Sequence, residues 1–348
     1  MLRITLLVTD FLFAPVTWAA DSRYTLTPSP VIGYDPTYGW LLGAALFVYP
    51  DETLPGNPAN RYFDILAMHV DGPAWMLRSH FKQRDFLPGA NFSLEAVYSD
   101  FYSPWFGEGD ATPDTPLYKI DQRFLTLRPA VEFPLTKTLE WSLFVDYRQR
   151  RDQGVDGDPS LHLFPDETTT ALGIGMNDDT RSDHFSPRTG HLAELKLSRI
   201  GPESTNLDGA KTVWQLEGEW RQYADLSHDI AWAGRLTAGI SDGDPGYLFR
   251  YALGGAEKLR GLEGNRLRGK RYWLVQNEVR YPIWRFISGT AFIESGSVGE
   301  ESYGAPRTTY GVGLRFGLPP DFRVKLRFDF ARTEGEETLT YIDFGHAF

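Results

Sequence analysis

The sequence predicts an all-β protein, a transmembrane antiparallel β-barrel of about sixteen strands in a Gram-negative outer membrane. Three observations lead to this fold class. Apolar and polar residues alternate with a period of two over much of the chain, aromatic residues are abundant, and no run approaches the roughly 20 apolar residues of a membrane helix. A membrane span in such a chain has to be a closed barrel, because lipid offers no partner for unpaired backbone groups.

Alternation with a period of two is clearest in residues 321–332, DFRVKLRFDFAR. Apolar side chains occupy every second position from Phe322 to Phe330, and charged side chains from Arg323 to Asp329 fill the positions between them. In a strand these two sets point to opposite faces, whereas a helix would spread them around its circumference. An apolar outer face and a charged inner face fit a barrel with lipid outside and a water-filled lumen.

About sixteen segments follow this pattern, and we expect each of them to form one strand. They are residues 28–34, 38–49, 60–71, 73–84, 90–101, 118–133, 138–150, 166–176, 190–200, 211–223, 228–241, 270–282, 286–294, 307–317, 321–331 and 337–348. An even number of strands leaves both chain ends in the periplasm, so the connections alternate between the two sides of the membrane. The shorter connections, such as 134–137, are predicted on the periplasmic side, and the longer ones, such as 242–269, outside the cell.

Composition narrows the classes of function. The 348 residues include no cysteine, which excludes a disulfide scaffold and a thiolate metal site. The formal net charge of -11 argues against a nucleic-acid partner. The chain has 10 Trp, 17 Tyr and 23 Phe, residue types that gather at membrane interfaces. No metal-spaced histidine pair or phosphate-binding loop is present in the sequence, so we expect neither a metal nor a cofactor.

Two parts are expected along the chain. Residues 1–20 have the pattern of a signal peptide, with Arg3 before an apolar stretch at 6–13 and a small-x-small cleavage site at 17–19. The alternative is a disordered N-terminus. Residues 21–348 contain no linker and no shift in composition, so they are expected to form one outer-membrane β-barrel domain.

The longest predicted connection contains the most informative motif. Its residues are Gly254, Gly255, Leu259, Arg260, Gly261 and Leu262. Here the sequence resembles the sixth external loop of the outer-membrane assembly and translocation barrels, the family of BamA and TamA that is also called the bacterial surface antigens. That family has Gly-Gly followed by a hydrophobic-Arg-Gly-aromatic motif, and this chain departs from the pattern by carrying Leu262 at the aromatic position.

Further segments resemble the same family in the same order. They are the turn at 178–197, the twelfth and thirteenth strands at 274–283 and 292–298, the last strand at 341–348, and an opening hairpin at 30–50. The last strand carries Phe344 and the terminal Phe348, which the resemblance identifies as the signal read by the barrel insertion machinery. Continued alternation predicts that Ile342, Phe344 and His346 face outwards.

The resemblance also implies a mechanism for the loop. In the family the sixth loop folds back into the lumen and its arginine pairs with carboxylates on the inner wall, which here would place Arg260 against Glu278 and Glu294. The alternation agrees, because it turns both glutamates inwards and an ionised carboxylate facing lipid is costly. The alternative is that Arg260 is one solvated loop arginine among several.

The resemblance therefore implies a protein that assists insertion or translocation of proteins or lipids at the outer membrane. Full family members carry periplasmic domains of the POTRA type, and because only residues 21–27 precede the first predicted strand, we expect a member without them. A separate periplasmic partner would then supply their role. The other expected partners are outer-membrane lipids and lipopolysaccharide, and the insertion machinery during biogenesis.

Two other functions stay open at this point. One is a passive pore or structural barrel, which a steadily conducting, unplugged lumen would favour over an assembly protein. The other is an outer-membrane lipase or protease, for which His80, His184 and His228 are candidate groups because Ser or Asp residues lie nearby in the sequence. No nucleophile elbow is present in the sequence, so we expect no enzymatic activity.

Overall fold

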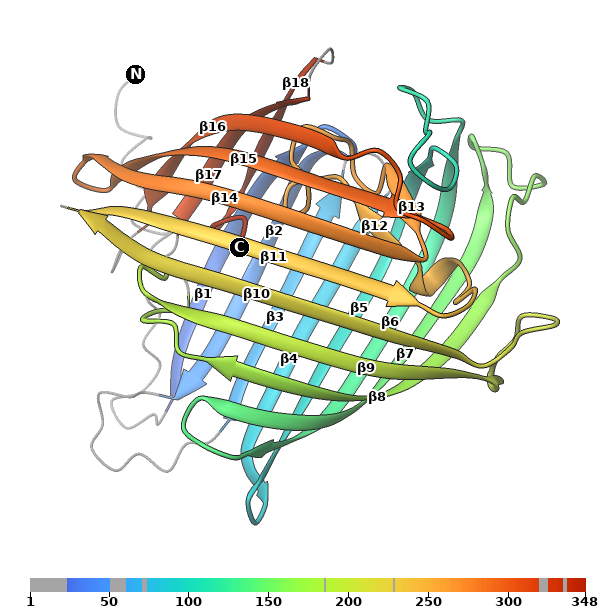
Figure 1. Ribbon diagram of the computed structural model, residues 1–348, viewed down its shortest axis with the longest axis horizontal. Helices are drawn as coiled ribbons and strands as arrows, with labels where there is room; N and C mark the ends of the chain where they lie inside the picture. Colours follow the sequence, from blue (N-terminus) through green and yellow to red (C-terminus); the bar gives the residue numbers. More distant parts are fainter. Residues whose placement is uncertain are drawn as a thin grey trace, which may run out of the picture.

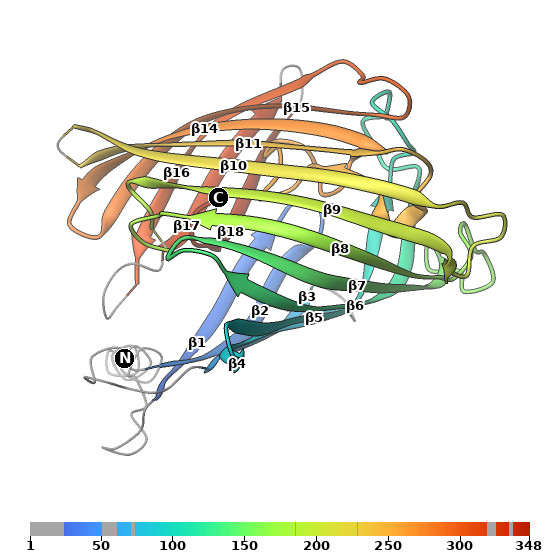
Figure 2. The same ribbon diagram turned by 60° about the horizontal axis from the view of Figure 1, so that its bottom comes forward.

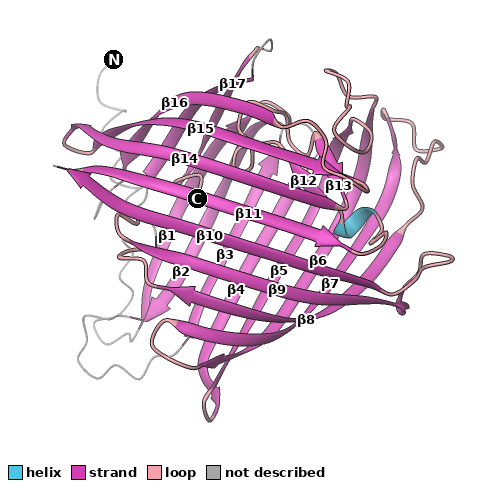
Figure 3. Cartoon of the chain, in the orientation of Figure 1, coloured by secondary structure: helices cyan, strands magenta, loops and turns pink. Residues whose placement is uncertain are grey.

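The structure, a computed structural model, describes residues 24–50, 61–70, 74–184, 186–227, 229–318, 325–333 and 337–348. Sixteen antiparallel strands form a closed barrel in which neighbours in sequence are neighbours in the wall, and β18 returns to β1 (Figure 1). A separate two-stranded sheet, β12 with β13, belongs to the long connection between β11 and β14. Almost all regular structure is therefore strand (Figure 3).

The bounds of the wall strands are these: β1 Tyr24–Asp35, β2 Gly39–Pro50, β3 Arg61–Val70, β4 Trp75–Leu87, β5 Ala90–Trp105, β6 Tyr118–Pro134, β7 Leu139–Val155, β8 Glu167–Asp179, β9 Gly190–Thr205, β10 Val213–Ser227, β11 Ile230–Ser241, β14 Arg271–Trp284, β15 Ile287–Gly299, β16 Arg307–Gly317, β17 Lys325–Thr333 and β18 Thr338–Phe344. The β11–β14 connection contains one 3-10 turn, η1 Tyr247–Phe249, and the short strands β12 Tyr251–Leu253 and β13 Leu267–Gly269.

The connections divide the barrel into two ends. We call "loop end" the end with the long connections after β5, β7, β11 and β15, which lie on the right in Figure 1, and "turn end" the end with the tight turns after β4, β6 and β14. Figure 2 shows the same strands running obliquely around the lumen. Among the described residues, no helix is long and apolar enough to cross a membrane.

The predicted fold class is confirmed, and each predicted segment overlaps one wall strand. The main differences lie at strand ends. Strands β5, β7 and β9 continue beyond their predicted ends at the loop end, to Trp105, Val155 and Thr205. Beyond the apolar band both faces of a strand meet water, so alternation stops while backbone pairing continues.

The two faces of the wall have opposite chemistry. Large apolar side chains are exposed on the outside, for example Leu172 at 55% and Ile293 at 53%. Their neighbours in sequence point into the lumen, where Glu294 is buried beside Gln276 across the β14–β15 ladder. A soluble protein would bury the apolar set, so this arrangement fits a barrel surrounded by lipid.

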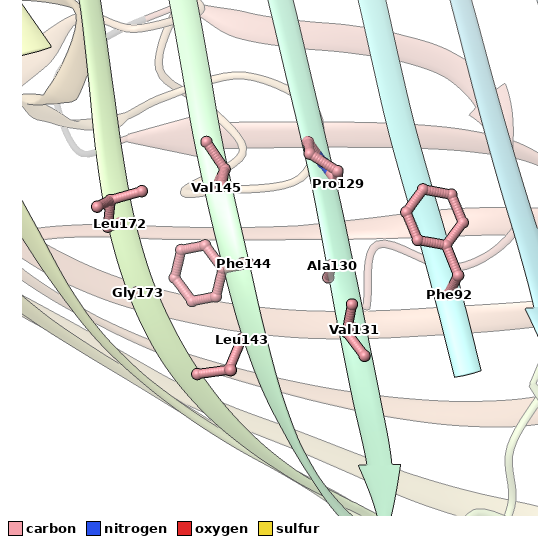
Figure 4. Close-up of a pocket in the computed structure, with 9 residues that line it drawn as sticks. All are labelled: Phe92, Pro129, Ala130, Val131, Leu143, Phe144, Val145, Leu172 and Gly173. Atoms are coloured by element: carbon pink, nitrogen blue, oxygen red, sulfur yellow. The ribbon is translucent and has the colours of Figure 1, made fainter. Parts of the chain in front are cut away.

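The pairing of β6 with β7 is interrupted in the middle of the ladder. Between β6 and β7 the ladder passes from Leu127↔Tyr147 to Ala130↔Phe144 with no pairing in between, at the position of Pro129. Proline has no N–H to donate, which explains the break. An apolar depression of 380 Å³ lies there, and Figure 4 shows its lining side chains on β5 to β8.

Candidate functional site

The β11–β14 connection forms a hairpin that packs inside the barrel. Its stem is the pairing of β12 with β13, from Tyr251↔Gly269 to Leu253↔Leu267. The loop tip, which we define as residues 254–266, contains the motif singled out in the sequence. Four loop leucines form a buried cluster with inward side chains of β14 and β15: Leu253, Leu259, Leu262 and Leu267 with Tyr272, Leu274 and Val298. Full burial of each leucine stabilises the packed loop by about 1.5–3 kcal/mol.

The glycine at the centre of the motif is required by geometry. Gly261 has φ 97°, in the region that favours glycine. A Cβ there would also lie 3.1 Å from backbone atoms of Arg332 on β17. The tip therefore lies directly against the backbone of β17, and only glycine fits that approach without displacement.

Arg260 is the most densely paired side chain of the tip. Its guanidinium lies 2.6 Å from Glu294 Oε1, 3.2 Å from Glu278 Oε2 and 2.8 Å from Asp329 Oδ2. The backbone N–H of Arg260 donates a further hydrogen bond to Glu294 Oε2 at 2.7 Å. The guanidinium carbon stacks 3.5 Å above the centroid of the Phe292 ring. All four charged side chains are fully buried.

The family resemblance implied two of these carboxylates as partners of Arg260, with alternation agreeing on their inward orientation, and did not include the third. Asp329 comes from β17, and its inward orientation could be read from alternation, but nothing in the sequence indicated that the tip would reach so far round the wall. The structure therefore brings Arg260, Glu278 and Glu294 together, and adds Asp329. We call these three acids the carboxylate cluster. The role of the contact as a lock for the loop stays a prediction.

Other arginines on the wall balance the charge of the carboxylate cluster. Arg280 donates to Glu278 at 2.8 Å, Arg315 lies against Asp329 at 2.5 Å, and Arg327 lies 3.8 Å from Asp329. A buried ion network of this kind adds little net stability when complete, but loss of one partner leaves an uncompensated charge and costs about 3–5 kcal/mol. The cluster is therefore sensitive to withdrawal of Arg260.

The tip is also tied to the last two strands. The N–H of Gly261 donates to Tyr341 Oη at 3.1 Å, and the Tyr341 hydroxyl donates to the carbonyl of Leu262 at 3.0 Å. The hydroxyl of Thr333 donates to the carbonyl of Gly261 at 3.0 Å. Tyr341 belongs to β18 and Thr333 to β17, so the loop contacts the strands that close the barrel.

On the other side, the tip contacts the turn between β1 and β2. The N–H of Gly264 donates to Thr37 Oγ1 at 2.7 Å, and Asp35 accepts from the N–H of Thr37 at 2.8 Å. The Tyr102 hydroxyl donates to the carbonyl of Thr37 at 2.7 Å and holds that turn in place. The loop tip thus touches both the first hairpin and the last strand.

These contacts matter because the junction of the first and last strands, which we call the seam, is weak. Strand β1 pairs with β2 along its whole length, from Tyr24↔Pro50 to Asp35↔Gly39. In the described residues a single register pair, Tyr34↔Ile342, joins β1 to β18. The loop tip, through Thr37 and Tyr341, bridges a junction that backbone pairing alone barely closes.

The C-terminal residues differ from the expectation. Strand β18 ends at Phe344, Gly345 has φ 79°, and the chain then turns into the lumen. Phe348 is buried in a cluster with Tyr223, Ala233 and Ala347 instead of continuing the strand. The prediction that His346 faces outwards is therefore wrong, because alternation holds only while the strand continues.

The turned-in C-terminus reaches the same carboxylate cluster. Arg280 Nη2 donates to the carbonyl of Phe348 at 3.1 Å, and His346 Nδ1 lies 3.7 Å from Glu278 Oε1. His346 Nε2 is 3.3 Å from Ser186 Oγ in the β8–β9 turn. Burial, together with the nearby Arg280 guanidinium, lowers the pKa of His346 to about 3. The histidine is therefore neutral at physiological pH.

The histidines considered for an enzyme are not brought together. His80 lies on β4, 3.6 Å from Asp64, and His184 lies in the β8–β9 turn, 3.5 Å from Asp179. His228 falls outside the described residues. Within the part of the chain that the structure describes, no group of His, Asp and Glu side chains could hold a metal ion.

Comparison with known families supplies the assignment. The Omp85 superfamily domain matches residues 81–346, which cover β5 to β18 and the whole of the loop tip. The chain belongs to the Omp85 superfamily. A search of curated protein sequences found no match.

Solved structures of the same architecture agree with this assignment. BamA from Haemophilus ducreyi lacking POTRA domains 1–3 superposes with a TM-score of 0.65 at 14% identity, covering 93% of this chain and 70% of that one. CdiB from Escherichia coli gives 0.64 at 14% identity, covering 94% of this chain and 63% of that one. CdiB from Acinetobacter baumannii gives 0.61 at 10% identity, covering 93% and 59%. At these identities the likeness shows the shared barrel fold.

Proposed function

We propose that this Omp85 barrel acts in the outer membrane, where it assists insertion or translocation of proteins or lipids and uses the seam as its opening. The observation that carries the proposal is the contrast at the seam. One register pair joins β1 to β18, while the loop tip contacts Thr37 on one side and Tyr341 on the other. In this proposal the activity of the barrel consists of opening and closing at the seam.

The physical argument concerns unpaired backbone groups. In a lipid environment each unsatisfied N–H or C=O is costly, so closed barrels normally pair every strand fully. Strand β1 carries Pro28 and Pro30, which lack N–H donors, and the described part of β18 is only Thr338–Phe344. A seam of this kind opens at far lower cost than any other junction in the wall, and its free edges can pair with an incoming strand.

The loop tip controls whether the seam can open. With Arg260 in the carboxylate cluster, the tip is held against β17 and β18, and contacts from both sides of the seam converge on one short segment. Withdrawal of the tip would remove these contacts together. The relation to BamA and CdiB barrels supports an assembly or translocation role, with other proteins as substrates or partners.

The test is a reversible bond across the seam. The chain has no cysteine, so Tyr34→Cys with Ile342→Cys introduces one pair at the register position that joins β1 to β18. The readout is the rate at which an unrelated small outer-membrane barrel folds into liposomes that contain the protein. We expect the parent to accelerate folding, the oxidised variant to lose the acceleration, and reduction to restore it.

The matched control closes a junction that is already fully paired. Trp220→Cys with Leu236→Cys places the same bond between β10 and β11, at outward-facing register partners. Oxidation of this control should change nothing. If the oxidised seam variant is as active as the reduced one, the seam is not the opening. Steady large conductance of the parent in planar bilayers would instead favour the passive pore.

A further inference from the structure

Part of the inner wall formed by the first strands is apolar. Register places several apolar side chains on the inward face of β1 to β5; Ala45 and Val70 are buried, and six others in neighbouring register positions are only partly buried. We call these six residues the inner patch: Val31, Leu41, Leu66, Met68, Met76 and Val97. Barrel lumens are normally polar, so a partly exposed apolar surface inside one requires an explanation.

A single cation sits at the edge of the inner patch. Arg78 on β4 is the register partner of Leu66 on one side and of Val97 on the other, so it faces the lumen among them. It is exposed, and within the described part of the chain it makes no salt bridge. The next inward residues of β4 are engaged, because His80 contacts Asp64 and Lys82 contacts Glu132 at 2.6 Å. Asp64 on β3 interacts electrostatically with Arg78 without forming a salt bridge, so the exposed guanidinium can still contact an anion.

From these observations we propose that the inner patch and Arg78 form a binding site for a membrane lipid with an anionic headgroup. The acyl chain lies along the inner patch and the headgroup contacts Arg78. Four strands at about 4.8 Å spacing give the patch a width of about 14 Å from β4 to β1, enough for much of an acyl chain. Guanidinium binds phosphate oxygens in a two-pronged geometry, which suits a phospholipid or a lipid A phosphate.

A polypeptide fits the inner patch less well. Five of the six residues of the inner patch lie on β2 to β5, and because β2, β3 and β4 are paired on both sides, this part of the patch offers no free backbone edge to an extended chain. A peptide would bring N–H and C=O groups into an apolar surface without partners, which is costly. An acyl chain has no such groups to satisfy.

The position of the inner patch supplies an entry route. It begins at Val31 on β1, the strand that forms one side of the seam, so lipid outside the barrel and the inner patch are separated by the weakest junction in the wall. For this route the proposal rests on the proposed function. The experiment below reads occupancy rather than assembly activity, so its failure leaves the proposed function standing.

The experiment is photolabelling of the full chain in nanodiscs that contain a trace of phosphatidylglycerol with a diazirine in its acyl chain. Labelled residues are mapped by mass spectrometry at single-residue resolution. Outward residues such as Leu42, Ile65 and Ala67 face bulk lipid and should be labelled in every sample. We expect label also on the inward Leu66 and Met68, and much less of it when the probe is phosphatidylcholine.

Variants separate the parts of the proposal. Arg78→Gln should lower inward labelling by phosphatidylglycerol roughly tenfold, the loss expected for one charge-assisted hydrogen bond, and leave outward labelling unchanged. Lys196→Gln is the matched control, because Lys196 is an inward cation on β9, outside the inner patch, that is already paired with Glu194 at 3.0 Å. Heat-modifiable migration checks that each variant is folded.

Three results would overturn the proposal. One is the absence of inward label while outward label is normal. Another is inward label that depends neither on the headgroup nor on Arg78. The third is displacement of the inward label by an amphipathic β-strand peptide but not by an equal amount of unlabelled phosphatidylglycerol, because the inner patch would then be a polypeptide site.

Discussion

At the scale of single residues, the molecule concentrates its interactions on Arg260. One guanidinium meets three carboxylates from three different strands, in a place with no access to water. A solvated loop arginine would contribute almost nothing to the position of the loop. The buried one instead makes the loop position depend on a single side chain.

The first prediction concerns that side chain. Arg260→Ala leaves Glu278, Glu294 and Asp329 without their shared cation. We expect this to destabilise the docked loop tip by about 3–5 kcal/mol and so to release it from the wall. External proteinase K should then cleave the 242–270 connection faster, and planar bilayers should show larger or more frequent openings. Arg260→Lys should keep only part of the parent's resistance to cleavage and opening, because an ammonium cannot make the planar two-pronged contact.

The control is another paired arginine of the same connection. Arg250 contacts Glu300 at 2.6 Å and Glu108 at 3.2 Å, near the loop end and away from the carboxylate cluster. Arg250→Ala should alter local contacts but leave the bilayer recordings close to those of the parent. Equal behaviour of the two alanine variants in both assays would contradict the lock.

The second prediction concerns the pH dependence of the turned-in C-terminus. The pKa of the docked His346 is about 3, below that of a free imidazole at about 6.5, so the docked tail binds fewer protons than the free tail. Docking is therefore at full strength above about pH 6.5 and weakens steadily as the pH falls towards 3. Release of Phe348 by a carboxypeptidase should be faster at about pH 5 than at pH 7, relative to a variant without the histidine.

The comparison with His346→Gln removes the pH dependence of the peptidase itself. Glutamine keeps a hydrogen-bonding group near Ser186 but does not titrate, so the ratio of the two release rates isolates the imidazole. A ratio that stays constant between these pH values would show that protonation of His346 is not linked to docking.

At the scale of elements, the loop tip and the seam depend on each other. The tip approaches β17 closely enough that residue 261 has to be glycine, and it hydrogen bonds to β18 and to the β1–β2 turn. Pairing between β1 and β18 is too short to position these strands alone. The loop tip, carried by the hairpin of β12 and β13, therefore connects the first and last strands of the barrel.

The third prediction tests this close approach. Gly261→Ala and Gly209→Ala both place alanine at a positive φ, 97° and 69°, so each bears a backbone cost of about 1–2 kcal/mol. At Gly209 a Cβ would meet no atom within 4 Å, whereas at Gly261 it would meet the β17 backbone. Only Gly261→Ala should expose the loop tip to proteinase K and lower the temperature at which the barrel loses its heat-modifiable form. If the two variants are indistinguishable, the tip does not rest on β17.

The sequence was most informative about elements that alternation controls. The wall strands, their parity and the inward orientation of Glu278, Glu294 and Asp329 all follow from the contrast between lipid and water. Alternation carries no information where the chain leaves the wall, which is why β12, β13 and the inward turn after Phe344 were not predicted. Contacts such as Gly264 with Thr37, 227 residues apart, depend on barrel closure and could not be read from local pattern.

At the scale of the whole molecule, the inner wall differs in character on the two sides of the seam. The wall from β14 to β18 is covered by the loop and by buried ion pairs, whereas the wall from β1 to β5 presents the partly exposed inner patch. The seam is the junction at which these two regions of the wall meet. An opening at the seam would thus expose an apolar surface on the side of β1 and a charged, loop-covered one on the side of β18.

The last prediction fixes the orientation of the barrel in the membrane. Because sixteen antiparallel strands place the start of β1 and the end of β18 at the turn end, all connections of the loop end lie on one side, and in a barrel exported to the outer membrane that side faces the medium. Single cysteines at Gly157 or Glu301, in connections after β7 and β15, should therefore react with an impermeant thiol reagent on intact cells. Cysteines at Gly89 or Thr136, in turns after β4 and β6, should react only after the outer membrane is permeabilised. Since the chain has no native cysteine, every signal comes from the chosen position, and labelling of Gly89→Cys on intact cells would show that the loop tip faces the periplasm.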